Sequence, residues 1–189
     1  RVSADGTAAD RVLTAGTATD PVSADSMAAD PVSADTAWTV LYTFPGSPSV
    51  EPGLAPGWEH VPGGPGCTLE ARTFRDRLAE FTQADAAVIG VCTQRPEQLA
   101  QFAAAENLPF PLLSDQDLEF TTALRMPSFR AANADRLKRA TLIVDATRTV
   151  RGVLYPVPDP AASVDDALRI IEGLRGRQPV GTAKGPGTP

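Results

Sequence analysis

Residues 65–71 read Pro-Gly-Cys-Thr-Leu-Glu-Ala and place Cys67 at the boundary between a loop and a helix. The preceding stretch, residues 47–66, is rich in proline and glycine, so we expect no regular structure there. After the cysteine, apolar side chains recur at helical spacing, at Ala71, Phe74, Leu78 and Phe81. The sequence therefore predicts a helix that begins at or just after Cys67.

This position has a chemical consequence for the Cys67 thiol. Unpaired N–H groups in the first turn of a helix, together with the positive end of its dipole, stabilise a thiolate and lower the pKa of a cysteine. Gly66 allows a small substrate to approach those N–H groups, and Pro65 adds an apolar wall. We therefore expect a reactive thiol. The alternative is a small residue buried in the core, as free cysteines often are.

The rest of the chain alternates between strand and helix patterns. Continuous apolar, β-branched or aromatic runs predict strands at residues 38–44, 86–91, 110–113, 140–145 and 150–155. Helical spacing predicts further helices at residues 96–107, 115–124 and 164–174. This order requires parallel crossovers and one antiparallel hairpin, so we expect an α/β fold with a mixed β-sheet flanked by helices. In such folds ligands bind and active sites lie beyond the carboxyl ends of the strands, where we expect Cys67.

The 189 residues divide into three expected segments. Residues 1–36 repeat with a period of ten around Val-Ser-Ala-Asp, which favours a flexible, low-complexity leader. A hairpin turning at Asp5-Gly6 is the alternative for that segment. Residues 37–175 form the expected domain, and residues 176–189 form a Gly/Pro-rich tail.

Charge and composition exclude several classes of partner. Six Asp and two Arg give residues 1–36 a charge of −4, which leaves −2 of the net −6 for the remaining residues. Since no basic run follows, we expect no nucleic-acid partner. No stretch approaches the roughly 18 apolar residues of a bilayer span, and no signal-peptide pattern opens the chain, so we expect a soluble, cytoplasmic protein without a membrane partner. Two cysteines and His60 at no recognised ligand spacing predict no metal, and we expect no other cofactor.

The motif around Cys67 also resembles a known family. Residues 65–71 with Phe74-Arg75-Asp76 are similar to the peroxidatic-cysteine motif of the peroxiredoxins, most closely the bacterioferritin comigratory protein (Q-type) subfamily. Residues 88–91, 108–115 and 139–145 resemble later segments of the family in order. The long loop before the cysteine resembles a redoxin-domain branch in which that loop is extended. The resemblance covers about residues 38–174 and implies a thioredoxin-like fold.

The resemblance implies a thiol-dependent peroxidase that reduces hydrogen peroxide or organic hydroperoxides. Cys67 would attack the peroxide as a thiolate and become a sulfenic acid. Arg139 would hold the thiolate and polarise the O–O bond, whereas without the resemblance we would expect a surface ion pair there. Gly64, Pro65, Gly66 and Thr68 would form the active-site loop, and Glu70 would support the network. The implied partners are the peroxide and an external thiol reductant, thioredoxin-like or of low molecular weight, acting on a monomer or homodimer.

Two positions depart from the family pattern. Gly64 stands three residues before the cysteine, where the family usually carries a Thr or Ser hydroxyl that hydrogen-bonds the peroxide. Arg72 stands where many Q-type members have a resolving cysteine, so that disulfide is impossible. Cys92 is the remaining candidate for resolution. If it has no redox role, an external thiol reduces the sulfenic acid.

Other roles stay open. His60 is a candidate proton donor or a solvated side chain, and Trp58 is expected to anchor the long loop by packing. The same fold and thiol would also suit a specialised biosynthetic reaction. A third hypothesis is a non-catalytic, redox-responsive binding protein whose long loop docks a partner.

Overall fold

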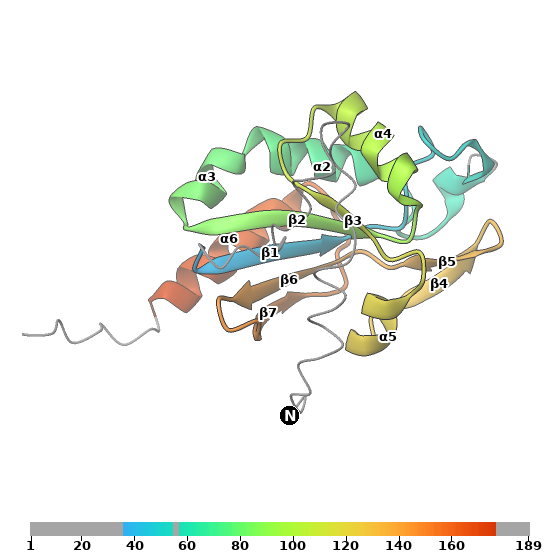
Figure 1. Ribbon diagram of the computed structural model, residues 1–189. Helices are drawn as coiled ribbons and strands as arrows, with labels where there is room; N and C mark the ends of the chain where they lie inside the picture. Colours follow the sequence, from blue (N-terminus) through green and yellow to red (C-terminus); the bar gives the residue numbers. More distant parts are fainter. Residues whose placement is uncertain (1–35, 55–56, 177–189) are drawn as a thin grey trace, which may run out of the picture.

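A five-stranded mixed sheet forms the centre of the computed structural model, which describes residues 36–54 and 57–176 (Figure 1). Its strands lie in the order β3-β2-β1-β6-β7. They are β1 (Trp38–Thr43), β2 (Ala86–Cys92), β3 (Leu112–Ser114), β6 (Ala140–Asp145) and β7 (Val150–Leu154). β1, β2 and β3 are parallel, whereas β6 pairs antiparallel with both β1 and β7.

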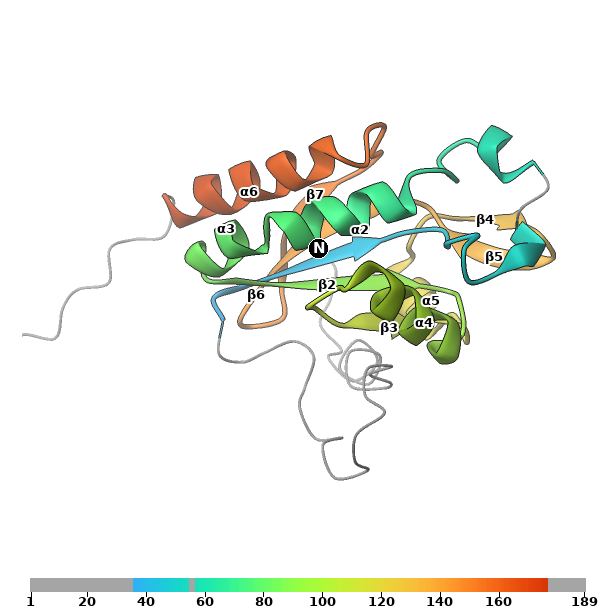
Figure 2. The same cartoon turned by 90° about the horizontal axis from the view of Figure 1, so that it is seen from above.

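Helices cover both faces of this sheet. They are η1 (Pro52–Leu54), η2 (Trp58–His60), α2 (Cys67–Asp76), α3 (Leu78–Gln83), α4 (Pro96–Glu106), α5 (Glu119–Leu124) and α6 (Ala162–Arg175). Figure 1 shows α2, α3 and α4 above the sheet and α5 below it, and Figure 2 shows α6 running beside α2 and α3. The predicted α/β fold with a mixed, helix-flanked sheet is confirmed.

Strand β1 is buried on both faces and fixes the position of α2. On one face the Tyr42 ring stacks on Phe74 of α2, with ring centroids 4.6 Å apart. On the other face Leu41 belongs to a cluster that includes Phe120 of α5. Burial of a large aromatic side chain contributes roughly 1.5–3 kcal/mol relative to exposure. This packing holds the first turn of α2 beside the carboxyl ends of β1 and β2.

Three local predictions were wrong. Residues 47–66 contain the single turns η1 and η2 instead of irregular chain alone. The predicted helix after Cys67 is broken at Arg77, which leaves helical geometry at φ −110° and separates α2 from α3. Helix α5 begins at Glu119 and not at residue 115, because the Asp115 carboxylate accepts the N–H groups of Phe120 and Thr121 and so caps the helix.

A second, two-stranded sheet was not predicted. It is the hairpin of β4 (Ser128–Ala131) and β5 (Ala134–Leu137). Its turn residues, Ala132 and Asn133, both have positive φ, at 49° and 61°. Asn-Gly is the strong signal for such a turn, and Ala-Asn lacks the glycine.

Several predictions fall outside the described residues. The leader up to residue 35, its alternative hairpin and the tail from residue 177 stay predictions. Within residues 36–54 and 57–176, no helix combines the length and apolar character that crossing a bilayer requires.

Candidate active site

Helix α2 begins at Cys67, as predicted, and Gly66 makes this start possible. Gly66 has φ +102°, a conformation that L side chains rarely adopt, and a Cβ atom there would lie 2.6 Å from Cγ of Pro160. The loop before α6 therefore packs directly on the backbone that precedes the cysteine. This contact fixes where the first turn of α2 starts.

The Cys67 thiol is buried, with 3% of its surface exposed. Its Sγ lies 3.4 Å from Nη2 of Arg139 and 3.5 Å from the carbonyl oxygen of Gly64, to which it donates. Burial raises the pKa of Cys67 above its ordinary value; Arg139 opposes this rise, and Glu70 adds to it. Burial thus acts against the lowering of the pKa that the helix N-terminus predicts. Desolvation opposes the stabilisation of the thiolate at this buried position.

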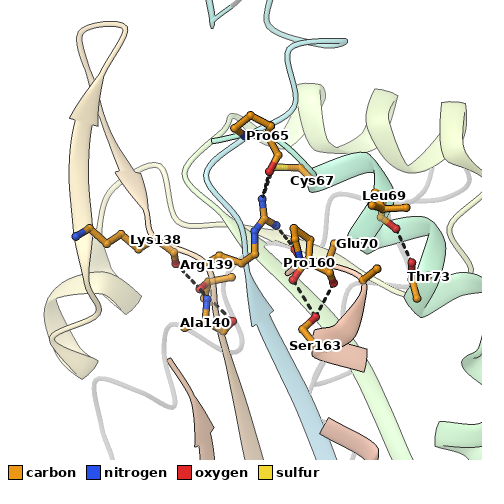
Figure 3. Close-up of polar contacts among 12 residues, drawn as sticks. Pro65, Cys67, Leu69, Glu70, Thr73, Lys138, Arg139, Ala140, Pro160 and Ser163 are labelled. Carbon is orange, nitrogen blue, oxygen red and sulfur yellow. Dashed lines mark hydrogen bonds and ion pairs between the residues drawn. The ribbon is translucent and has the colours of Figure 1, made fainter. Parts of the chain in front are cut away.

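Arg139 joins three parts of the site from the first residue before β6 (Figure 3). Its Nη1 forms an ion pair with Glu70, and its Nη2 donates to the carbonyl oxygen of Pro65 at 3.0 Å. The guanidinium is almost completely buried. A rigid planar fork suits these simultaneous contacts, which a single ammonium group does not reproduce. Arg139 is therefore a buried, fully engaged cation and not a surface ion pair.

Glu70 is the buried carboxylate that balances Arg139. Ser163 of α6 places its Oγ 3.3 Å from Glu70 Oε1 and 2.8 Å from the carbonyl oxygen of Pro160. Burial raises the pKa of Glu70 to about 7, while Arg139 and Ser163 oppose the shift. Figure 3 shows Ser163 reaching Glu70 from α6, so three segments of the chain meet at the site: residues 64–70, Arg139 and residues 160–163.

A pocket of about 350 Å³ opens beside the thiol. One wall is the turn Pro65–Thr68, and the other consists of Pro48, Trp58 and Glu59 from the long loop. Three of the predicted loop residues, Pro65, Gly66 and Thr68, therefore line the space next to Cys67. The pocket is large enough for an organic group in addition to a peroxide.

Gly64 does not line this pocket. A Cβ at Gly64 would lie 3.1 Å from the carbonyl oxygens of both Trp58 and Val61. Helix η2 and the turn that follows it are closed by hydrogen bonds from Val61 N to Trp58 O and from Gly64 N to Val61 O, at 3.1 and 2.8 Å. The coiled loop thus occupies the space that a Thr or Ser side chain would need.

Cys92 lies at the end of β2, as predicted, but is completely buried. The backbone N–H of Gln94 donates to its Sγ at 3.4 Å, and burial raises the pKa of Cys92 far above its ordinary value. Gln94 in turn holds the loop, because its Oε1 accepts from Ser47 N at 2.8 Å and its Nε2 donates to Glu51 at 2.8 Å. Cys92 therefore sits beneath the base of the long loop, without solvent access.

Helix α2 is tied to α4 at the position of the missing second cysteine. Arg72 Nε lies 2.6 Å from a carboxylate oxygen of Glu106, and Arg75 donates to the Glu106 carbonyl oxygen at 2.6 Å. Asp76, at the end of α2, pairs with Arg75. These contacts hold α2 in its helical form.

The two remaining candidates in the long loop, His60 and Trp58, differ in burial. The His60 side chain is 84% exposed and does not line the pocket, although its Nε2 lies 3.6 Å from the Glu59 carboxylate. Trp58 is buried, as expected of an anchor, and stacks on Phe129 of β4 with ring centroids 6.4 Å apart. Sequence reasoning missed the contributions of Pro48, Glu59 and Ser163. No signal in the sequence marked Ser163, which precedes the helix predicted at residues 164–174.

Comparison with known proteins identifies the family. Residues 61–153 match the AhpC/TSA family. A putative peroxiredoxin of Mycobacterium tuberculosis (strain CDC 1551 / Oshkosh) is 31% identical over 111 residues, which are 59% of this chain and 72% of that relative. The chain belongs to the peroxiredoxin family. The predicted family is thereby confirmed.

Two further similarities set the extent of the relationship. Another putative peroxiredoxin of the same strain is 52% identical over 59 residues, which span 31% of this chain and only 38% of the relative's length. The crystal structure of peroxidoxin BcpB from Mycobacterium tuberculosis matches this peroxiredoxin with a TM-score of 0.62 and 26% identity. That match covers 77% of this chain and 84% of the other. It supports the predicted thioredoxin-like fold and the Q-type relationship.

Proposed function

We propose that this peroxiredoxin is a thiol-dependent peroxidase that reduces hydrogen peroxide or organic hydroperoxides. The observation that carries the proposal is the 3.4 Å approach of Arg139 Nη2 to Cys67 Sγ beside an open pocket. Family membership supports it, whereas the comparisons give no support to a specialised biosynthetic reaction or to a redox-responsive binding protein. Cys67 is the proposed nucleophile and Arg139 the proposed cation.

The proposed reaction transfers one oxygen atom to sulfur. The Cys67 thiolate attacks the terminal oxygen of R–O–O–H, a sulfur–oxygen bond forms, and the O–O bond breaks. Sulfur is oxidised by two electrons to the sulfenic acid, and the electron pair of the O–O bond leaves with R–O⁻. R–O⁻ takes up the proton released when the thiol ionised, so the products are Cys67–SOH and water or an alcohol.

Arg139 supports both ends of this step. Its positive charge stabilises the thiolate against the cost of burial, and it also stabilises the negative charge that develops on the leaving oxygen. The first-turn N–H groups of α2 lack intrahelical acceptors and add further donors toward the pocket. Glu70 and Pro65 hold the guanidinium in place, so the cation is oriented before the peroxide arrives.

We further propose a one-cysteine cycle. Cys92 is completely buried and accepts a hydrogen bond from Gln94, and α2 is tied to α4 through Arg72, so forming a disulfide would disturb these contacts. In the proposed cycle an external thiol attacks the sulfenic acid and releases water. A second thiol then restores Cys67 and leaves as a disulfide.

The proposed reductant is a thioredoxin-like protein or a low-molecular-weight thiol. A reducing compartment such as the cytoplasm suits this chemistry, because Cys67 and Cys92 are both free thiols. A monomer or a homodimer would serve equally well.

The test is peroxide consumption with excess dithiothreitol as the reductant. Wild type and Cys92→Ser should both consume hydrogen peroxide, and Cys67→Ser should be inactive. Inactive wild type, or undiminished consumption by Cys67→Ser, would overturn the proposal. Loss of turnover in Cys92→Ser, together with a Cys67–Cys92 disulfide in oxidised wild type, would replace the one-cysteine cycle by resolution within the chain.

A further inference from the structure

The pocket beside Cys67 has an apolar wall that the long loop supplies. Pro48 and Trp58 face the thiol-bearing turn across a space of about 350 Å³. A hydrogen peroxide molecule needs far less space than this. The remaining volume suits an apolar substituent on the peroxide, since contact with an indole ring removes apolar surface from water.

The Trp58 wall is fixed in position. Its ring stacks on Phe129 of β4 with an interplanar angle of 26°, and its backbone oxygen accepts the N–H of Val61. Its side chain is almost completely buried. A bound substituent would therefore meet a surface that is already in place, so little ordering entropy is lost on binding.

Glu59 adds a negative charge at the rim of the same pocket. Its side chain is 64% exposed, and it is the one carboxylate among the described residues that line the pocket. No Lys or Arg is among the described residues that line the pocket, and Arg139 beside Cys67 is already paired with buried Glu70. A substrate that carries a carboxylate would therefore meet repulsion from Glu59 without a free cation of the site to offset it.

We propose that Trp58 and Glu59 determine specificity, selecting neutral hydroperoxides with an apolar substituent over hydroperoxides that carry a carboxylate. This inference rests on the proposed peroxidase function. Trp58 supplies the contact with the substituent, and Glu59 supplies the discrimination by charge. Their effects are measured as ratios of rates between peroxides, so that a general change in the reactivity of Cys67 cancels.

The test compares three peroxides: hydrogen peroxide, cumene hydroperoxide and its para-carboxylate. The second-order rate constant for Cys67 oxidation is measured for each at the same pH. Glu59→Gln should raise the ratio of the carboxylate rate to the cumene hydroperoxide rate by about threefold. The gain should shrink at high salt. Glu97→Gln, the same charge change on exposed α4, should alter neither rate.

Trp58 is tested by the ratio of the cumene hydroperoxide rate to the hydrogen peroxide rate. Trp58→Leu should lower this ratio about tenfold, whereas Trp58→Phe, which keeps an aromatic ring, should retain most of it. An unchanged ratio in Trp58→Leu, or an equal effect of Glu59→Gln on both organic peroxides, would overturn the inference. If hydrogen peroxide oxidises Cys67 in wild type but neither Trp58→Leu nor Glu59→Gln has its expected effect, only the inference fails. If wild type does not react with hydrogen peroxide at all, the proposed function fails.

Discussion

Arg139 bridges Glu70 and Cys67: its Nη1 pairs with the carboxylate, and its Nη2 lies 3.4 Å from the sulfur. One guanidinium therefore divides its charge between a buried acid and a buried thiol. The balance between these two acidic groups sets how readily Cys67 ionises.

The shape of the Arg139 side chain should matter as well as its charge. Arg139→Lys keeps a cation but cannot contact Pro65, Glu70 and Cys67 together, so the rate constant for oxidation of Cys67 by hydrogen peroxide should fall about 100-fold. Stopped-flow fluorescence measures this rate. Arg130→Lys alters an exposed pair with Asp135 and should leave the rate within about twofold. Equal rates in wild type and Arg139→Lys would remove the proposed role of the fork.

The pKa of Cys67 should move in opposite directions when either partner of the ion pair is neutralised. Glu70 raises this pKa and Arg139 lowers it. We therefore expect Glu70→Gln to lower the pKa of Cys67 and Arg139→Gln to raise it. The pH dependence of alkylation by iodoacetamide, followed in a Cys92→Ser background, measures both shifts. Shifts of the same sign in the two variants would contradict the electrostatic account.

Glu70 should also make stability depend on pH. Its folded-state pKa is raised from 4.5 to about 7, so between these values the folded state holds a proton that the unfolded state has lost. The free energy of unfolding should therefore fall as pH rises from 4.5 to 7. Urea unfolding at several pH values should show that wild type loses stability relative to Glu70→Gln over this range. A constant difference would mean that the folded-state pKa of Glu70 is not raised.

Gly66 should tolerate substitution less well than another glycine of the same loop. Gly66→Ala adds a Cβ 2.6 Å from Pro160 Cγ at positive φ, and should cost about 2–4 kcal/mol of unfolding free energy. Gly63→Ala has φ +80° but no atom within 4 Å of its Cβ, so it should cost about 1 kcal/mol. Urea denaturation compares the two variants. An equal loss of unfolding free energy in the two variants would show that Pro160 can move away from the added Cβ at little cost.

Much of the framework could be predicted from the sequence because its signals are local. The apolar runs of β1 and β2 mark buried strands, and the change of period after Cys67 marks the start of α2. The helix break at Arg77 could not be predicted, because Phe74, Leu78 and Phe81 keep helical spacing across it. The break is accompanied by tertiary contacts, including the ion pair of Arg77 with Asp165 of α6.

The site shows the same division. The position of Cys67 and Gly66 between a loop and a helix predicted their place in the site, and the resemblance to the peroxiredoxins indicated Arg139 and Glu70. Ser163 and the pocket residues Pro48 and Glu59 carry no such signal, because the folding of the long loop and of α6 alone brings them near the thiol. Burial of Cys67 was only the alternative expectation, for a related reason. Desolvation depends on everything packed around a side chain, whereas a helix N-terminus can be read from its own sequence.

The central claim is that a peroxide transfers an oxygen atom to the sulfur of Cys67. Trapping of the resulting sulfenic acid tests this claim most directly. Reduced protein is mixed with one equivalent of hydrogen peroxide in the presence of dimedone, and the modified peptide is identified by mass spectrometry. The account predicts one adduct, on Cys67, in wild type and in Cys92→Ser, and none in Cys67→Ser. Wild type that stays fully reduced, or an adduct confined to Cys92, would contradict it.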